Sequence, residues 1–284
     1  MPTNYPVIDF GNNNKIYFTA SPVVSEINEK QLNVIFHGKD NHLFIPTPDM
    51  FQHSKIIFHG DKGYAYIQAT KHKKISLNLG IHRQSLFYMG ENCSCNGVLN
   101  AIVSESRHLI IGNDVMFSFG IWIRTCDVHL IYDHTSHKRI NLPQDVFIGD
   151  HVWLSQGSSL LKGAAIGSGS VVGFGALATK AYPSNRILSG SPAITGNKEI
   201  TWDRTSSHSY TPEQTENSID SFEKADAFWY SSEDNLSDYQ VQSERLRQVN
   251  IADKEEHLQW FQQNPLIIAV PKRTWRDKFY SLLK

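Results

Sequence analysis

The chain has 284 residues, of which 40% are hydrophobic and 19% charged, a composition that can bury a core and excludes a wholly disordered protein. Lys and Arg total 27 and Asp and Glu total 28, and the resulting net charge of −1 argues against a surface devoted to nucleic acid. No apolar run approaches the ~18 residues that span a bilayer, and no secretory signal is visible at the N-terminus. Three cysteines do not suggest a disulfide framework, so we expect a cytoplasmic protein.

Glycine divides the chain into regions. All 18 glycines lie within residues 1–196, and the last 88 residues contain none. Because glycine marks tight corners, the first part turns often and the second does not. We therefore expect an N-terminal lead-in over residues 1–29, a turn-rich domain over 30–196, and a mainly helical extension over 197–284.

The early part of the second region contains a loose repeat. In each copy an apolar stretch precedes a glycine, and the glycines of the four copies are 22, 30 and 22 residues apart. The copies are Ile35-Phe36-His37-Gly38, Ile57-Phe58-His59-Gly60, Phe87-Tyr88-Met89-Gly90 and Ile110-Ile111-Gly112. We interpret them as irregular early coils of a solenoid, with excursions between them.

A strict six-residue register follows. From Ile148 it runs IGDHVW, LSQGSS, LLKGAA, IGSGSV, VGFGAL and ATKAYP, and from Ile111 it runs IGNDVM, FSFGIW and IRTCDV. The first position is apolar throughout the six contiguous hexads, and the fifth is mostly small. A helix would repeat near 3.6 residues and an ordinary strand every 2. Three short strands per coil of about 18 residues explain the pattern, so it predicts a parallel β-helix.

The register breaks between Asp127 and Val146, which indicates a loop insertion near residues 129–145. The inserted segment contains His129, His134 and His137. An interruption of a rigid repeat is a place where a loop can carry function.

These motifs resemble a known family. The hexads, IGDHVWL, LLKGAAIGSGSVVG, the Thr179-Lys180 step and SGSPA are similar to left-handed β-helix, hexapeptide-repeat acyltransferases, and among them to bacterial O-acetyltransferases of capsule or other surface polysaccharides. The resemblance covers residues 105–196 well, 30–104 weakly and the tail not at all. Two places depart from the family pattern: Gly190-Ser191 before Pro-Ala, and Cys126-Asp127-Val128 before the histidine.

The resemblance implies a left-handed β-helix, acetyl-CoA as co-substrate, a sugar or polysaccharide acceptor and a homotrimer with its coenzyme groove between neighbouring solenoids. His129 matches the family's active-site histidine, and imidazole can withdraw the proton of a sugar hydroxyl near neutral pH. Asp127 could hold that imidazole, although a backbone carbonyl could do so equally well. Trp153 follows His129 by 24 residues, as in capsule sialic-acid O-acetyltransferases, and its indole N–H could stabilise an oxyanion. The implied reaction is direct attack in a ternary complex.

Candidate coenzyme contacts follow from the same resemblance. Lys162, Lys180 and Arg186 could meet the phosphates, although an exposed lysine at a coil corner can equally be only solvated. Small residues at Gly157, Gly173 and Ala176 would let the coenzyme approach the backbone. His134 and His137 are candidates for acceptor contact.

Three alternatives stay open. The fold also supports a γ-carbonic-anhydrase-like zinc lyase, for which His129, His134 and His151 would be the ligands. A catalytically silent scaffold is the second alternative, and an acetyltransferase acting on a small nucleotide-linked sugar is the third. We expect no metal and no nucleic-acid partner.

The tail predicts two or three amphipathic helices that pack on the solenoid or on a neighbouring subunit. Thr211-Pro212-Glu213 has the pattern of an N-cap followed by proline in the first turn. The last residues, from Pro271 to Lys284, carry five basic groups and large apolar side chains. They could touch an anionic membrane at its inner face, but we favour a docked C-terminal helix.

Overall fold

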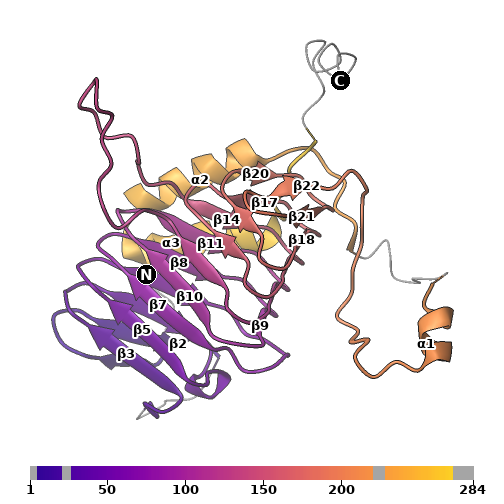
Figure 1. Ribbon diagram of the computed structural model, residues 1–284. Helices are drawn as coiled ribbons and strands as arrows, with labels where there is room; N and C mark the ends of the chain where they lie inside the picture. Colours follow the sequence, from indigo (N-terminus) through magenta and orange to yellow (C-terminus); the bar gives the residue numbers. More distant parts are fainter. Residues whose placement is uncertain (1–4, 21–26, 220–227, 271–284) are drawn as a thin grey trace.

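The computed structural model describes residues 5–20, 27–219 and 228–270, and within them the strands form three sheets that wind into a solenoid (Figure 1). The nine-stranded sheet contains β1 (Val7–Asp9), β2 (Lys15–Phe18), β4 (His42–Ile45), β6 (Tyr64–Ile67), β8 (Leu86–Met89), β11 (His108–Ile111), β14 (Val146–Ile148), β17 (Ala165–Ile166) and β20 (Ala181–Tyr182). The seven-stranded sheet contains β3 (Leu32–Phe36), β5 (Ser54–Phe58), β7 (Leu77–Ile81), β10 (Leu99–Val103), β13 (Trp122–Arg124), β16 (Ser159–Leu160) and β19 (Leu177–Ala178). The six-stranded sheet contains β9 (Ser94–Cys95), β12 (Met116–Phe117), β15 (Trp153–Leu154), β18 (Val171–Val172), β21 (Ile187–Ser189) and β22 (Ile194–Thr195).

The pairing confirms the expected parallel β-helix. Strands from successive coils pair in parallel, and antiparallel pairs occur in these sheets only at the two ends, between β1 and β2 and between β21 and β22. In the upper coils the chain passes from the seven-stranded to the nine-stranded to the six-stranded sheet. Within the expected lead-in, β1 pairs with β2, and β2 pairs in parallel with β4, so these two strands extend the nine-stranded sheet.

The hexad register is confirmed by burial. The six first positions from Ile148 to Ala178 are 0% exposed, and the fifth positions from Val152 to Tyr182 are buried as well. The apolar members of both sets belong to one core cluster enclosed by the three sheets. An apolar side chain every sixth residue therefore points into the solenoid axis, as the period predicted.

The loose early repeat is also part of the solenoid, but its copies lie on two faces. The first two end β3 and β5 in the seven-stranded sheet, and the last two end β8 and β11 in the nine-stranded sheet. This change of face accounts for the 30-residue gap between two 22-residue gaps. Glycine is required where the coils stack, because a Cβ on Gly38 would come within 2.3 Å of the carbonyl oxygen of Gly60.

The extension contains helices α1 (Pro212–Asn217), α2 (Leu236–Gln248) and α3 (Ile251–Gln263). The predicted start at Thr211 is confirmed, since its hydroxyl accepts from the amide of Gln214 and Pro212 opens the helix. Residues 220–227 and 271–284 lie outside the described part of the chain. The helical pattern expected around Phe222 and Ala225, and the docking or membrane contact of the last residues, therefore stay predictions.

Helices α2 and α3 cover the outer side of the nine-stranded sheet (Figure 1). The sheet contributes a set of stacked aromatic rings: Tyr17, Phe44, Tyr64, Tyr66 and Tyr88. The helices contribute Tyr239, Leu246, Leu258 and Phe261. Polar groups fix the register, because Glu255 accepts from the hydroxyls of Tyr5 at 2.7 Å and Tyr66 at 3.2 Å. One of the three faces is thus closed by the chain's own tail.

A membrane span was sought among the helices of the described residues. None of them is both long and apolar enough to cross a bilayer.

Candidate active site

The insertion into the repeat is a projecting hairpin between β13 and β14 (Figure 1). Tyr132 and Arg139 form an antiparallel bridge, and the amide of Ile140 donates to the carbonyl of Ile131 at 2.9 Å. The hairpin leaves the solenoid at the corner between the seven-stranded and nine-stranded sheets. A loop held in this way can present side chains outside the coil without disturbing the core.

Asn141 fixes the base of this hairpin. It is 5% exposed, and its Oδ1 accepts from the amide of Ile131 at 2.9 Å. Its Nδ2 donates to the carbonyl of His129 at 2.7 Å and to Oδ2 of Asp127 at 3.0 Å. One buried amide therefore joins both arms of the hairpin at the residue that the sequence nominated as the base.

Arg139 adds a second anchor. Its guanidinium donates to Asn141 at Oδ1 and at the carbonyl oxygen, both at 3.2 Å, and makes a bidentate pair with Glu105 at 2.8 and 2.9 Å. Neither Asn141 nor Arg139 was predicted from the sequence. Both are polar residues of the segment Arg139-Ile140-Asn141, where the insertion rejoins the repeat, and this position could have identified them.

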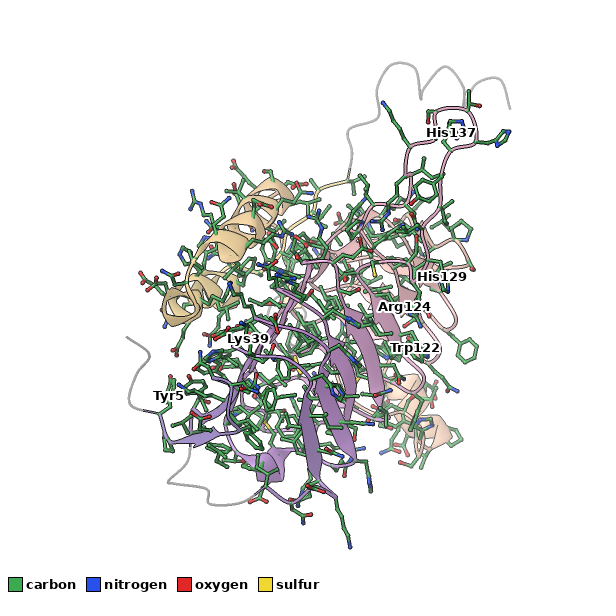
Figure 2. All side chains as sticks on the ribbon, turned by 90° about the vertical axis from the view of Figure 1, so that its left-hand side faces the viewer. Tyr5, Lys39, Trp122, Arg124, His129 and His137 are labelled. Carbon is green, nitrogen blue, oxygen red and sulfur yellow. The ribbon has the colours of Figure 1, made fainter. Side chains whose placement is uncertain are left out.

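His129 lies at the hairpin base with its side chain exposed. Its backbone is held through Asn141, while its imidazole makes no hydrogen bond to any residue that the structure describes. Figure 2 shows His129, Arg124 and Trp122 following one another down one side of the molecule. A fixed backbone with a free, accessible imidazole is what a base that meets an external substrate requires.

Asp127 does not hold that imidazole. Its Oδ2 pairs with the ammonium of Lys162 and accepts from Asn141. The hydrogen bond from Lys162 is the main cause that lowers the pKa of Asp127, and the Asn141 amide adds to it. Asp127 is therefore a carboxylate that reaches His129 only through Asn141, and Lys162 is engaged by it instead of being free for a phosphate.

Trp153 lies in β15 of the six-stranded sheet, and its indole N–H donates to Oγ of Ser118 at 3.1 Å. The hairpin leaves from the corner formed by the other two sheets. In a three-sided coil that corner is opposite the six-stranded face, so one chain does not bring His129 and Trp153 together.

The expected coenzyme contacts fall into two groups. Lys180 is exposed, with its ammonium 5.8 Å from the ring centre of Tyr182, and Gly157 is exposed with a φ of +71°. Gly173 is half-buried. Arg186 and Ala176 do not offer the contacts we expected. The guanidinium of Arg186 is buried and donates to Glu199 at 2.9 Å, and the methyl group of Ala176 belongs to the core.

His134 and His137 are both exposed in the outer part of the hairpin. Figure 2 shows His137 near the tip, away from His129. The structure thus separates these two histidines from the hairpin base, and their role in acceptor contact stays a prediction.

The ligand set of the zinc alternative is not assembled. No group of three His, Cys, Asp or Glu side chains among the described residues could hold a metal ion. His151 is buried elsewhere, with Nδ1 2.6 Å from Oδ2 of Asp114 and Nε2 2.9 Å from the carbonyl of Trp202. Its ring is stacked at 4.0 Å against both Trp202 and Phe228, so it attaches the extension to the coil.

The chain was also compared with known proteins. No protein-family model matches the chain. It is 37% identical over 140 residues to the "Polysialic acid O-acetyltransferase" of Escherichia coli O1:K1 / APEC, which covers 49% of this chain and 45% of that protein. It is 32% identical over 153 residues to the protein of the same name from Neisseria meningitidis, covering 54% of this chain and 67% of that one. The chain thus matches about half to two thirds of the length of these curated relatives.

The crystal structure of the polySia-specific acetyltransferase NeuO is similar with a TM-score of 0.52 and 25% identity, covering 66% of this chain and 94% of that one. The likeness confirms the left-handed β-helix of acetyltransferases that the hexads predicted.

Proposed function

The chain belongs to the same family as the polysialic acid O-acetyltransferases, and we propose that it transfers acetyl from acetyl-CoA to a hydroxyl of a bacterial capsular polysaccharide, with His129 as the general base. The observation that carries the proposal is the state of His129. Its imidazole is exposed and without a hydrogen-bond partner in the described chain, while Asn141 fixes its backbone.

The proposed step balances without an acetyl-enzyme. The acceptor hydroxyl attacks the thioester carbonyl carbon while His129 takes its proton. The carbon–oxygen bond forms, and the resulting oxyanion needs a hydrogen-bond donor. As the carbon–sulfur bond breaks, the imidazolium returns the proton to the coenzyme A thiolate. The products are an acetyl ester and coenzyme A.

We further propose that a second copy of the chain completes the site, as in the expected trimer. Helices α2 and α3 occupy the nine-stranded face, so a neighbour has the other two faces available. The hairpin also carries six large apolar side chains that are each at least half exposed: Val128, Leu130, Ile131, Tyr132, Ile140 and Leu142. A neighbour packed under them would bring its Trp153 toward His129 and would shield this apolar surface from water.

The coenzyme would lie along the outside of the coil. Among the expected contacts, Lys180 keeps an accessible ammonium for a phosphate, and Gly157 leaves the backbone open to the pantetheine arm. The thiols of Cys93, Cys95 and Cys126 are free, which suits the reducing cytoplasm that we propose as the site of the reaction.

The test is acetyl transfer from labelled acetyl-CoA to polysialic acid, with CMP-sialic acid as a second acceptor. We expect transfer to the polymer and a loss of about 10²–10⁴-fold in His129→Ala. Retained activity in that variant would contradict the base assignment. Preferential acetylation of CMP-sialic acid would instead favour the nucleotide-sugar alternative.

Subunit mixing tests the shared site. His129→Ala and Trp153→Ala chains are each expected to have low activity, but mixed oligomers should regain up to about a quarter of the wild-type sites if the two residues come from different copies. A mixture as inactive as its components would contradict a site shared in this way.

A further inference from the structure

We propose that the outer side of the seven-stranded sheet, below His129, is a furrow that binds the part of a carboxylate-bearing polysaccharide extending away from the reacting sugar. The inference rests on the proposed function, because it assigns the acceptor class of the same site. It is carried by two rows of side chains that follow the solenoid axis across successive coils, with a shallow strip between them.

Three stacked imidazoles form the first row, which we call the histidine ladder. His37, His59 and His82 follow β3, β5 and β7 at the corner from which the hairpin later emerges. Ring centroids are 6.0 Å apart between His37 and His59 and 4.6 Å apart between His59 and His82. The described part of the chain offers their ring nitrogens no hydrogen-bond partner, so they are available to an external ligand.

The second row consists of polar and aromatic side chains on the same sheet. Strand pairing places Lys55, Asn78, Asn100 and Trp122 opposite one another in successive coils. Asn78 donates to Asn100 at 3.0 Å, and Trp122 is 40% exposed. Amides and an exposed indole face are groups that bind sugar hydroxyls and the apolar face of a sugar ring.

A shallow strip separates the two rows. Its members are Ile57, Gly80 and Ile102, which are opposite one another and each only half-buried. Gly80 leaves the middle of the strip without a side chain, and a Cβ built there would meet only the His59 ring, at 3.5 Å. The His59 imidazole thus borders the strip at Gly80 on the side of the ladder.

The charged side chains around the furrow favour an acidic ligand. Lys55 stands at one end of the furrow, and Arg124 stands near the other, 5.2 Å above the Trp122 ring. Glu105, the acidic side chain in the coil below the hairpin, is already neutralised by Arg139. Because a polymer with one carboxylate per sugar can meet several of these groups at once, weak individual contacts add along the chain.

The furrow also has a direction. Arg124 ends β13, and the chain then continues through Thr125 and Cys126 to the hairpin base. Figure 2 shows Trp122, Arg124 and His129 in sequence along this side. A polymer lying in the furrow would thus deliver one sugar to His129 while its remaining residues contact the earlier coils.

Two variants remove different parts of the furrow. His59→Glu combined with His82→Glu adds two negative charges to the ladder at neutral pH, and Gly80→Ile fills the strip without changing any charge. Lys73→Glu is the matched control, because it produces the same charge change at neutral pH on an exposed residue of the loop before β7. The probes are polysialic acid, a disialyl oligosaccharide and neutral dextran.

Polymer binding is measured without acetyl-CoA, so it can be scored even if acetyl transfer fails. We expect both furrow variants to weaken polysialic acid binding at least tenfold and the control to stay within twofold. Turnover of the disialyl acceptor should change less than twofold in all three. Unchanged polymer binding would overturn the proposal, as would equal binding of dextran. A furrow variant that dissociates the oligomer in sedimentation would show that another copy of the chain occupies this face.

Discussion

Replacing Asn141 gives the most direct test of whether the hairpin positions the proposed base, His129. Asn141→Ala removes four hydrogen bonds, from Ile131 and Arg139 to its oxygen and from its amide to His129 and Asp127. A buried hydrogen bond contributes about 1 kcal/mol net, and each group left unpaired adds about 1–3 kcal/mol. Four such bonds amount to roughly 4 kcal/mol before the unpaired groups are counted, so we expect the hairpin base to populate open arrangements.

The expected result is a fall of about 10–100-fold in kcat, with the KM for acetyl-CoA nearly unchanged, because the base is displaced while the coenzyme surface stays intact. The Tm should fall little, since the solenoid core does not depend on the hairpin. Ser136→Ala, near the hairpin tip, is the control and should behave as wild type. Steady-state kinetics with both substrates and a thermal melt measure these effects. A kcat within twofold of wild type in Asn141→Ala would refute the positioning role, even if His129→Ala is inactive.

Three further perturbations test other parts of the structure. Burial lowers the pKa of Lys254 to about 8, so between pH 8 and 10.5 the folded state binds fewer protons than the unfolded state. Lys254→Met should therefore stabilise the protein near pH 7, and thermal melts should show this gain shrinking as the pH rises through that window. His151→Phe keeps the stacking on Trp202 but loses both hydrogen bonds, so trypsin should cleave near Arg204 at least tenfold faster, whereas unchanged cleavage would mean that stacking alone holds the segment. Burial, with the His59 imidazole adding to it, lowers the pKa of His82 below the ordinary histidine value of 6.5, and burial, with His37 and Lys55 adding, does the same for His59. Polysialic acid binding should therefore strengthen only as the pH falls below 6.5, and a flat profile there would contradict the ladder's part in it.

The repeat made most of the fold predictable. Each hexad carries its own burial signal, and parallel stacking then places Ile148, Leu154 and Leu160 in the core without long-range information. The insertion was equally visible, because it breaks a strict register. The tail was predictable only as helices, since the sequence does not say which of three sheets an amphipathic helix will cover.

Side-chain partners in the site could not be predicted in the same way. Asp127 and Lys162 are 35 residues apart, and Trp153 and Ser118 are also 35 apart, because the inserted hairpin lengthens one coil. A short spacing such as Asp127 to His129 suggests contact more strongly than a long one does. The structure favours the long-range partner, because stacking brings Lys162 against Asp127 while Asn141 takes the place next to His129.

The C-terminal extension limits which surfaces of the solenoid other molecules can reach. By covering the nine-stranded sheet, α2 and α3 remove one side of the triangular coil from contact with other molecules. By stacking Trp202 on His151, the segment before them also occupies a corner of the six-stranded sheet, close to Trp153. The second chain that we propose would therefore approach along the remaining surface, which is where the apolar hairpin projects. The same restriction leaves the lower part of the seven-stranded sheet, away from the hairpin, as the surface on which a long acceptor can lie. An extension with no residue in the proposed chemistry would thus decide from which sides the acceptor and the second chain can reach His129.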